Sequence, residues 1–346
     1  MKQPLISVVI PFRNASPWIG EAMHSLLAQT ESNFEIIAVD DGSTDNGSDI
    51  ALRTIGTKLP ITILQNAPDK GIMTALNRGL RASSGRYIAR MDADDICLPN
   101  RFARQIEFIQ HAHVDICGSW FIEFGQGIPR TVRWPHTESA LRAAMLFQNT
   151  ICHPTVMARR EVFDKYQYST EFPLLSDYDL FARVLANFHM ANIPEVLLRY
   201  RRHPAQVTQS KRDALEVVAK QIRLNALAAE GIDTSPLEKE LHNMIRASES
   251  IRRPEHLSGI QSWLLKLVGL FNNDEAKQVI ATQWVRACIR AAPLGATMLR
   301  EFHKSPLRLL SGAGITTSID LAALAALRLN YQSHTFAILR RFGLSA

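Results

Sequence analysis

The sequence predicts an α/β fold with a mostly parallel central sheet flanked by helices, followed by an all-helical C-terminal extension. Up to Arg90, short runs rich in β-branched residues alternate with amphipathic helical patterns. Beyond Ser210 the strand-like runs stop, while helical patterns continue. Alternating strands and helices are typical of βαβ units, whose ligands bind at the carboxyl ends of the strands. We therefore expect functional residues directly after strands.

Each element of the predicted sheet rests on its own pattern. Buried strands are expected at 5–10, 34–39, 61–64 and 87–90, where β-branched residues gather. Helices are expected between them, at 17–29, 45–56 and 72–83. Ser16 followed by Pro17 predicts an N-cap with proline at the first helical position.

The C-terminal part is predicted to be helical throughout. Apolar residues recur at helical spacing over 211–229, 236–250, 258–271, 274–291 and about 320–330. We therefore expect two domains, a ligand-binding domain over 1–210 and a helical region over 211–346. The helical region is expected to contact a second substrate that accepts a transferred group, a membrane surface or another copy of the chain.

The positive charge is concentrated in the C-terminal part. The chain has a net charge of +6, and residues 201–346 hold 20 Lys/Arg against 12 Asp/Glu. A basic region can contact nucleic acid or an anionic membrane, or can simply be a solvated helical surface. Because the basic residues alternate with acidic ones and never occur four in a row, we expect no nucleic-acid partner. Reversible attachment to an anionic membrane stays as a hypothesis.

Composition limits the class of protein and its compartment. The 346 residues are 46% hydrophobic and 21% charged, as in an ordinary globular protein. The four cysteines have neither the density of a disulfide scaffold nor a C-x-x-C spacing, which favours the reducing cytoplasm. No apolar stretch reaches the roughly 18 residues of a membrane span, and the N-terminal apolar run is too short for a secretory signal. We expect a cytoplasmic protein, free or at the inner face of the membrane.

Acidic residues follow two of the predicted strands. Asp41 lies in the turn 39–45, where it could accept hydrogen bonds from a base or ribose, or the segment could be only a turn with helix-capping residues. Asp92, Asp94 and Asp95 follow the strand at 87–90. Three carboxylates this close repel one another, so they indicate a site for Mg²⁺ or Mn²⁺ beside a diphosphate. The alternative is a solvated acidic turn.

Together these segments resemble the family 2 glycosyltransferases, which have the GT-A fold, a Rossmann-like α/β fold. The resemblance extends over 5–105 and is carried by residues 6–11 with Arg13 and Asn14, 25–30, 39–45, Gly71 and Ile72 with 76–79, and 92–95 with Pro99 and Arg101. It implies that Pro11 and Arg13 lie along the nucleotide pocket and that Asp41 contacts a uracil-type base. It also implies that Asp92 and Asp94 form the Asp-x-Asp pair, with Asp94 as a direct metal ligand and Asp92 beside metal and nucleotide.

Two later segments also look like elements of this family. In 174–180, Asp177 matches the catalytic base, while Ser176 stands where the family usually has Glu. The alternative is a helix start capped by Ser176. In 200–208, the resemblance implies that His203 is a third metal ligand or contacts the diphosphate together with Arg201 or Arg202. His153 resembles an element on the acceptor side, with a packed structural histidine as the alternative.

The resemblance implies an inverting transfer of one sugar from a nucleoside diphosphate sugar, expected to be UDP-linked, to a hydroxyl of a glycan or lipid-linked glycan. Bacterial cell-surface polysaccharide synthesis is the expected setting. One alternative is a non-catalytic member that binds a nucleotide sugar. Another is a metal-dependent nucleotidyltransferase or phosphatase, although the sequence has no glycine-rich phosphate loop with lysine.

Overall fold

The computed structural model describes residues 3–66, 71–172, 174–204 and 212–336, with the side chains of 212–214 excepted. The chain divides into two compact units, one made of 1–141 and 149–218, the other of 142–148 and 219–346. We call them the sheet unit and the helical unit. The division differs from the expected boundary after residue 210, because α8 (Arg212–Ala229) contributes to both units and a short piece from the middle of the chain joins the helical one.

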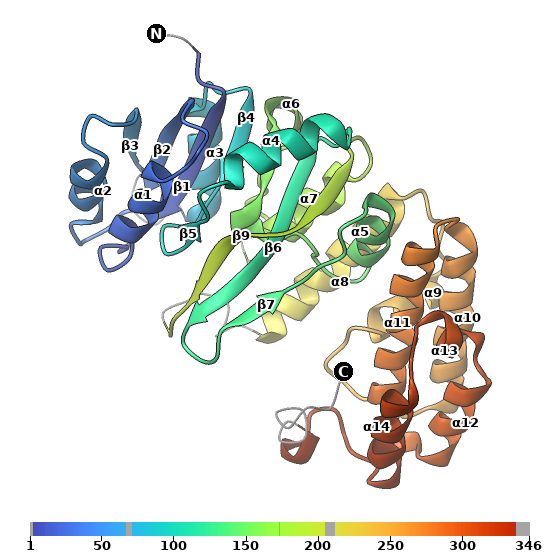
Figure 1. Cartoon of the computed structure of the whole chain (residues 1–346). Coiled ribbons are helices and arrows are strands. Elements are labelled where there is room, and N and C mark those ends of the chain that lie inside the picture. The colour runs from blue at the N-terminus through green and yellow to red at the C-terminus, as the bar shows by residue number, and fades with distance from the viewer. Residues whose placement is uncertain (1–2, 67–70, 173, 205–211, 337–346) are drawn as a thin grey trace. The chain divides into compact units, whose positions relative to one another are not determined.

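The sheet unit is built on a nine-stranded sheet in the order β3-β2-β1-β4-β8-β6-β9-β5, with β7 paired to β6 (Figure 1). The strands are β1 (Ile6–Phe12), β2 (Phe34–Asp40), β3 (Ile61–Gln65), β4 (Tyr87–Arg90), β5 (Ile96–Cys97), β6 (Ile116–Gly125), β7 (Arg130–Val132), β8 (Met157–Arg159) and β9 (Met190–Arg202). The first four are parallel to one another, with Ile6 of β1 opposite Phe34 of β2 and Tyr87 of β4. The four expected strands and the mostly parallel sheet are therefore confirmed.

Helices cover both faces of the parallel strands. The helices of the sheet unit are α1 (Ile19–Leu27), α2 (Gly47–Ile55), α3 (Ile72–Ala82), α4 (Arg101–His111), α6 (Arg160–Lys165) and α7 (Ser176–Val184), with a 3-10 turn at His153–Thr155. Helix α5 (Glu138–Met145) is divided between the two units. Alternate residues of β1, such as Ile6 and Val8, share one core with apolar residues of α1, α2 and α4. The opposite face, with Val39 of β2, packs against α3. Because both faces are covered, β1 is buried along its whole length.

The predicted helix start at Ser16 and Pro17 is wrong. Helix α1 begins at Ile19, after a turn in which the Ala15 carbonyl accepts from Trp18 and Ile19. The Ser16 side chain caps nothing there, because its own backbone N–H donates to Asp45 Oδ2 at 2.8 Å and this contact fixes a turn before the helix.

The helical unit contains α8 in part, α9 (Pro236–Met244), α10 (Pro254–Leu270), α11 (Asp274–Arg290), α12 (Ala296–Lys304), α13 (Pro306–Leu310) and α14 (Ile315–Ala326), with a 3-10 turn at Ala292–Leu294. The expected helices are present, with ends shifted by a few residues. The Ser235 side chain and Glu238 form a reciprocal capping box at the start of α9. Among the described residues, no helix is long and apolar enough to cross a bilayer.

A buried histidine joins residues 142–148 to the helical unit. The ring of His242 donates from Nε2 to the Leu146 carbonyl at 2.8 Å and accepts from Trp263 Nε1 at Nδ1 at 3.1 Å. Phe147 packs against the same ring, with 4.8 Å between centroids. Burial lowers the pKa of His242 to about 4, so the ring is neutral at pH 7 and both hydrogen bonds are satisfied.

Candidate active site

The sheet unit contains a cavity of about 720 Å³ at the carboxyl ends of its parallel strands. Its lining includes residues that directly follow or end β1, β2, β4 and β9, and the start of α7. The sequence-predicted residues that line it are Pro11, Arg13, Asp41, Asp92, Asp94, His153, Asp177 and His203. Residues from six separate segments of the chain thus meet in one hollow, as expected for a ligand site of an open α/β sheet.

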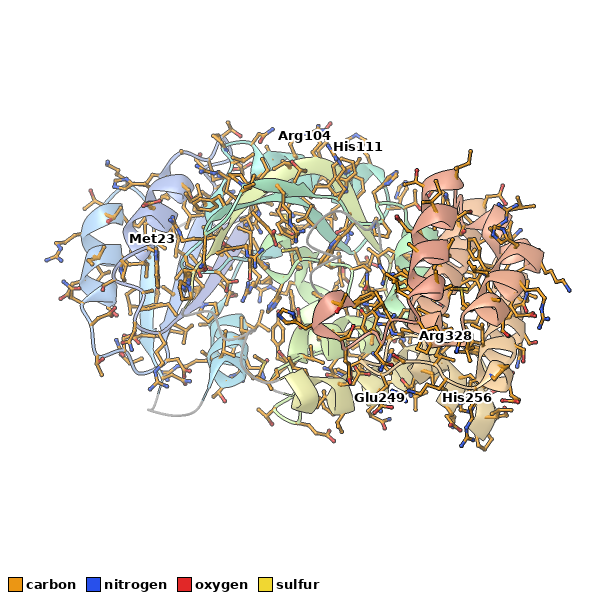
Figure 2. All side chains as sticks on the ribbon, turned by 90° about the horizontal axis from the view of Figure 1, so that it is seen from below. Met23, Arg104, His111, Glu249, His256 and Arg328 are labelled. Atoms are coloured by element: carbon orange, nitrogen blue, oxygen red, sulfur yellow. The ribbon has the colours of Figure 1, made fainter. Side chains whose placement is uncertain are left out.

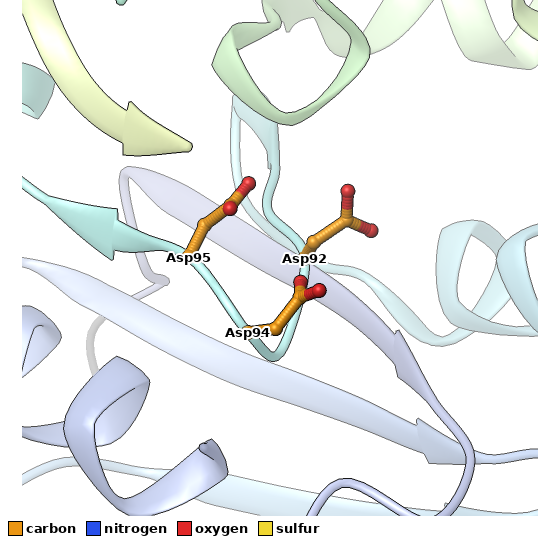
Figure 3. Close-up of side chains that lie close together, drawn as sticks. All are labelled: Asp92, Asp94 and Asp95. Carbon is orange, nitrogen blue, oxygen red and sulfur yellow. The ribbon is translucent and has the colours of Figure 1, made fainter. Parts of the chain in front are cut away.

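The acidic loop after β4 brings three carboxylates together (Figure 3). One oxygen from each of Asp92, Asp94 and Asp95 lies within 4.8 Å of the others. Asp92 is paired with Arg90 at 2.6 Å, and Asp95 is 1% exposed and accepts from the Arg201 backbone N–H at 2.8 Å. Burial raises the pKa of both Asp92 and Asp95, and their acidic neighbours raise it further.

This donor set fits a divalent cation. One oxygen of the buried Asp95 carboxylate has no hydrogen-bond partner among the described residues, and the repulsion within the loop would be relieved by a positive ion. Carboxylate oxygens are the ligands that Mg²⁺ and Mn²⁺ prefer.

His203 lies against the acidic loop although 109 residues separate it from Asp94. Its Nε2 is 2.9 Å from Asp94 Oδ2, and its ring stacks on Trp18 with 4.1 Å between centroids. The imidazole is therefore held where it can share a ligand with Asp94. The sequence did not point to Trp18 as part of the site, because tryptophan at helical spacing indicates a core position.

Arg201 supports the acidic loop from outside the cavity. Its Nε donates to the Asp94 carbonyl at 2.7 Å and its Nη2 to Glu21 at 2.7 Å. It is not among the described residues that line the hollow. Its predicted contact with the nucleotide stays a prediction, and the geometry gives it a supporting position.

The two aspartates at the end of β2 face different partners. Asp41 accepts from Asn66 Nδ2 at 2.8 Å and lines the cavity. Asp40 instead accepts from the Ser43 N–H and the Ser48 hydroxyl at 2.8 and 3.0 Å, which fixes the turn before α2. The expected turn is present, whereas the expected capping of α2 by residues 43–45 is not, because the N-cap is Asn46. The contact of Asp41 with a ligand stays a prediction.

Asp177 lies in the first turn of α7 and is held by two donors. The Tyr178 N–H donates to one carboxylate oxygen at 2.8 Å, and Asn149 Nδ2 donates to the other at 2.9 Å. Burial raises the pKa of Asp177 above its ordinary value. Ser176 is not the cap, since Leu175 holds that position and Ser176 is the first helical residue. Asn149 thus fixes the carboxylate from a distant segment, a partner that sequence spacing could not reveal.

Arg90 is the main cavity residue that sequence reasoning missed. It ends β4, is 4% exposed, and lines the cavity with its Nη2 on Asp92. Its Nε and Nη1 have no hydrogen-bond partner among the described residues. Such donors are rarely left unpaired in a protein, so they indicate room for a water or ligand oxygen. The only signal in the sequence was a charge at the end of an otherwise apolar strand.

His153 also lines the cavity. Its Nε2 is 2.6 Å from the Tyr168 hydroxyl, and Tyr168 exchanges backbone hydrogen bonds with the Asn77 side chain of α3 at 2.8 and 3.0 Å. Burial and the charge of Arg90 lower the pKa of His153 well below its ordinary value. The ring is therefore neutral at pH 7.

Comparison with known proteins identifies the class to which this fold and site belong. The family model described as glycosyl transferase family 2 matches residues 7–167. An uncharacterized glycosyltransferase of Haemophilus influenzae is 31% identical, with 64% of this chain and 72% of that protein covered. The amylovoran biosynthesis glycosyltransferase AmsE of Erwinia amylovora is 30% identical, with 66% and 86% covered. The chain belongs to glycosyltransferase family 2.

Solved structures agree with this assignment at the level of the fold. S. aureus TarS 1-349 in complex with UDP-GlcNAc has a TM-score of 0.56 and 17% identity, with 93% of this chain and 91% of that chain covered. The mannosyltransferase PcManGT from Pyrobaculum calidifontis, in complex with GDP-Man and Mn²⁺, has a TM-score of 0.52 and 16% identity, with 95% and 87% covered. The expected GT-A fold is confirmed.

Proposed function

We propose that this glycosyltransferase moves one sugar from a nucleoside diphosphate sugar, UDP-linked, to a hydroxyl of a glycan or lipid-linked glycan, with inversion at the anomeric carbon. The observation that carries the proposal is the single cavity that joins Asp41, the acidic loop with His203, and Asp177. These are a polar contact for a base, a place for a cation and diphosphate, and a separate carboxylate. A transfer reaction needs all three at once.

The donor end of the cavity is assigned to the side where β1 and β2 end. Pro11 and Arg13 line it beside Asp41, whose carboxylate is oriented by Asn66. A carboxylate held in this way can accept from a ring N–H or a ribose hydroxyl. Of the two structural neighbours, TarS was solved with UDP-GlcNAc and PcManGT with GDP-Man. The choice of uridine follows from the resemblance of the turn 39–45 and is the point that needs measurement.

The cation is assigned to Asp94, Asp92 and His203, and would be Mg²⁺ or Mn²⁺. When bound, it supplies positive charge against the departing diphosphate. The protein holds these ligands in position through its own contacts. Arg201 donates to the Asp94 carbonyl of the loop, and the stack on Trp18 orients the His203 ring.

Asp177 is assigned as the general base. The acceptor oxygen forms its bond to the anomeric carbon while the bond from that carbon to the diphosphate breaks, and the acceptor proton passes to Asp177. Burial raises the pKa of Asp177, which makes its carboxylate a better proton acceptor than a solvated aspartate. Attack from the face opposite the leaving group inverts the anomeric centre.

We assign the protein to cell-surface polysaccharide synthesis, at the cytoplasmic side of the membrane where nucleotide sugars are available. The name of the Erwinia relative, which refers to amylovoran biosynthesis, supports this setting. The expectation that the acceptor is a glycan or a lipid-linked glycan rests on the same ground.

The test is a panel of UDP- and GDP-sugars, with and without Mn²⁺, read by thermal stabilisation and by slow hydrolysis of the donor. We expect one UDP-sugar to stabilise the protein and to be hydrolysed only when the metal is present. A GDP-sugar as the preferred donor would overturn the uridine assignment. Stabilisation without any turnover would favour a non-catalytic binding protein, and phosphate release from simple monoesters would favour a phosphatase.

A further inference from the structure

Helix α14 of the helical unit has two opposite apolar faces. Leu321, Leu324 and Ala325 are buried against the unit. On the other side, Ile315 and Ile319 are 80% and 61% exposed, and the exposed alanines of the helix at 322 and 326 continue the same stripe at helical spacing. A surface helix normally has one apolar face, so the second indicates that something else covers it.

Two more exposed leucines lie in the preceding helix. Leu309 and Leu310 of α13 are 74% and 41% exposed and precede Ile315 by only a short turn. We call Leu309, Leu310, Ile315 and Ile319 the α13–α14 surface. Single exposed leucines are common, but four large aliphatic side chains within eleven residues are not explained by chance exposure.

Basic residues lie before and after the α13–α14 surface. Arg300 and Lys304 are exposed on α12, and Arg308 is half-buried on α13. Arg328, labelled in Figure 2, lies just past the end of α14. Among the described residues from 296 to 336 there are four Lys/Arg against two acidic residues, Glu301 and Asp320, with Glu301 paired to Arg300 at 3.3 Å. This stretch of the chain therefore carries a net charge of +2.

The sign of this charge decides between the possible occupants. A second copy of the chain in a two-fold contact would bring the same basic residues against one another. The C-terminal segment 337–346 carries two arginines and no acid, so it also has the wrong sign. An anionic lipid bilayer offers negative headgroups to the arginines and hydrocarbon to the aliphatic side chains, which is the pattern of an interfacial helix.

We propose that the α13–α14 surface docks on an anionic membrane, with Ile315 and Ile319 entering the boundary between headgroups and acyl chains. Attachment is peripheral and reversible. This contact does not depend on the reaction catalysed by the sheet unit, and it gives the enzyme access to acceptors at a membrane surface.

The test is co-sedimentation of the full chain with vesicles of phosphatidylcholine and phosphatidylglycerol, at low and high salt, with pure phosphatidylcholine vesicles as the comparison. We expect binding to the anionic vesicles at low salt and weaker binding at high salt. Ile315→Ser with Ile319→Ser should reduce the affinity roughly tenfold or more, and Arg300→Gln with Lys304→Gln by about tenfold. The matched control is Leu237→Ser with Leu270→Ser, which removes two side chains of 61% and 53% exposure outside this surface and should bind as wild type.

The outcomes separate this proposal from its alternatives. No binding of the wild-type chain at low salt, or equal loss in the control pair, overturns it. If the Ile315 and Ile319 variant instead changes the oligomeric state in light scattering while vesicles are not bound, the surface is a self-contact. Circular dichroism checks that each variant is folded. Donor hydrolysis on the same preparations shows whether the transferase assignment holds independently of docking.

Discussion

The two units of this glycosyltransferase differ in their unusual residues. The sheet unit buries carboxylates, and the helical unit exposes large apolar side chains. Among the described residues, the buried carboxylates are Asp40, Asp41, Asp95 and Asp179, and all lie in the sheet unit. Of the twelve large apolar side chains found exposed, eight lie in the smaller helical unit. Burying charge and exposing hydrocarbon both cost stability, so each needs a compensating contact or a function. In the sheet unit, Asp40 and Asp179 have structural partners, whereas Asp41 lines the cavity and Asp95 belongs to the acidic loop. In the helical unit, the exposed side chains include the α13–α14 surface, which we propose as a docking site.

The largest expected effect comes from Asp177, whose negative charge should be needed for catalysis and not for folding. Asp177→Asn keeps the shape of the side chain but removes proton acceptance, so turnover should fall by roughly 10²–10⁴ while UDP affinity hardly changes. Steady-state transfer kinetics and UDP titration on one preparation measure both. Asp179→Asn is a useful comparison, since Asp179 is two positions away but bonds to Arg183 instead of lining the cavity.

A near-normal turnover of the Asp177 variant would mean that another residue is the base. Loss of UDP binding would make Asp177 part of the nucleotide site. The pH profile adds a separate check: because the pKa of Asp177 is raised, the rate should fall as the pH drops through that raised value and the base becomes protonated.

The next largest expected effect is the loss of metal-dependent UDP affinity when one carboxylate of the acidic loop is neutralised. Asp94→Asn should keep the fold but lose the gain in UDP affinity that Mn²⁺ provides, by roughly a hundredfold if Asp94 is a direct ligand. Calorimetric titration with UDP, with and without Mn²⁺, measures this. Asp49→Asn, at an exposed position of α2, is the matched control and should retain the full metal effect. An unchanged metal effect in the Asp94 variant removes Asp94 from the site.

In the helical unit, the buried neutral ring of His242 should make stability depend on pH. Because the pKa of His242 is lowered to about 4 in the fold, the unfolded chain binds a proton first as the pH falls, and stability present above about pH 6.5 is lost. Between about pH 7 and pH 5, His242 should contribute a loss on the order of 2 kcal/mol in the free energy of unfolding.

The measurement is urea unfolding of wild type and His242→Phe at both pH values. The variant should be less stable at neutral pH, because Trp263 Nε1 and the Leu146 carbonyl lose their partner, and its stability should depend less on pH. The same pH dependence in both proteins would rule out His242 as its source. His153, whose pKa is also lowered, is unchanged in both and cancels in the comparison.

Two helical glycines, one in each unit, test the packing of the units separately. A Cβ at Gly79 of α3 would lie 2.5 Å from Val9 Cγ1, so Gly79→Ala should destabilise the sheet unit by about 1–3 kcal/mol. Gly269 of α10 has open space around it, and Gly269→Ala should stabilise the helical unit by roughly 0.5–1 kcal/mol. Thermal unfolding checks both signs. Equal changes in stability for Gly79→Ala and Gly269→Ala would contradict the close packing at Gly79 and the open space at Gly269.

Much of the fold was predictable because it depends on local patterns. The strands at 34–39 and 87–90 were visible as β-branched runs, and the parallel pairing of each with β1 followed from the helices that connect the strands. The true start of α1, at Ile19, was not predictable from local patterns. Asp45, from beyond the next strand, accepts a hydrogen bond from the Ser16 backbone N–H. Local capping rules cannot detect a competing donor or acceptor that arrives from elsewhere in the fold.

The sequence by itself predicted the chemical types of the candidate site through Asp41, Asp94 and Asp177. It also predicted that Asp41 and Asp94 follow strands, whereas Asp177 lies at the start of α7. Only the tertiary structure decided which residues stand beside them. It places Asn149 on Asp177 and His203 on Asp94, across separations of 28 and 109 residues. It also decides that Ile315 and Ile319 face outward while Leu321 and Leu324 face the core. The reason is physical: hydrogen-bonding type and periodicity belong to the local chain, whereas partners, burial and pKa depend on which distant segments the packed core brings within a few ångströms.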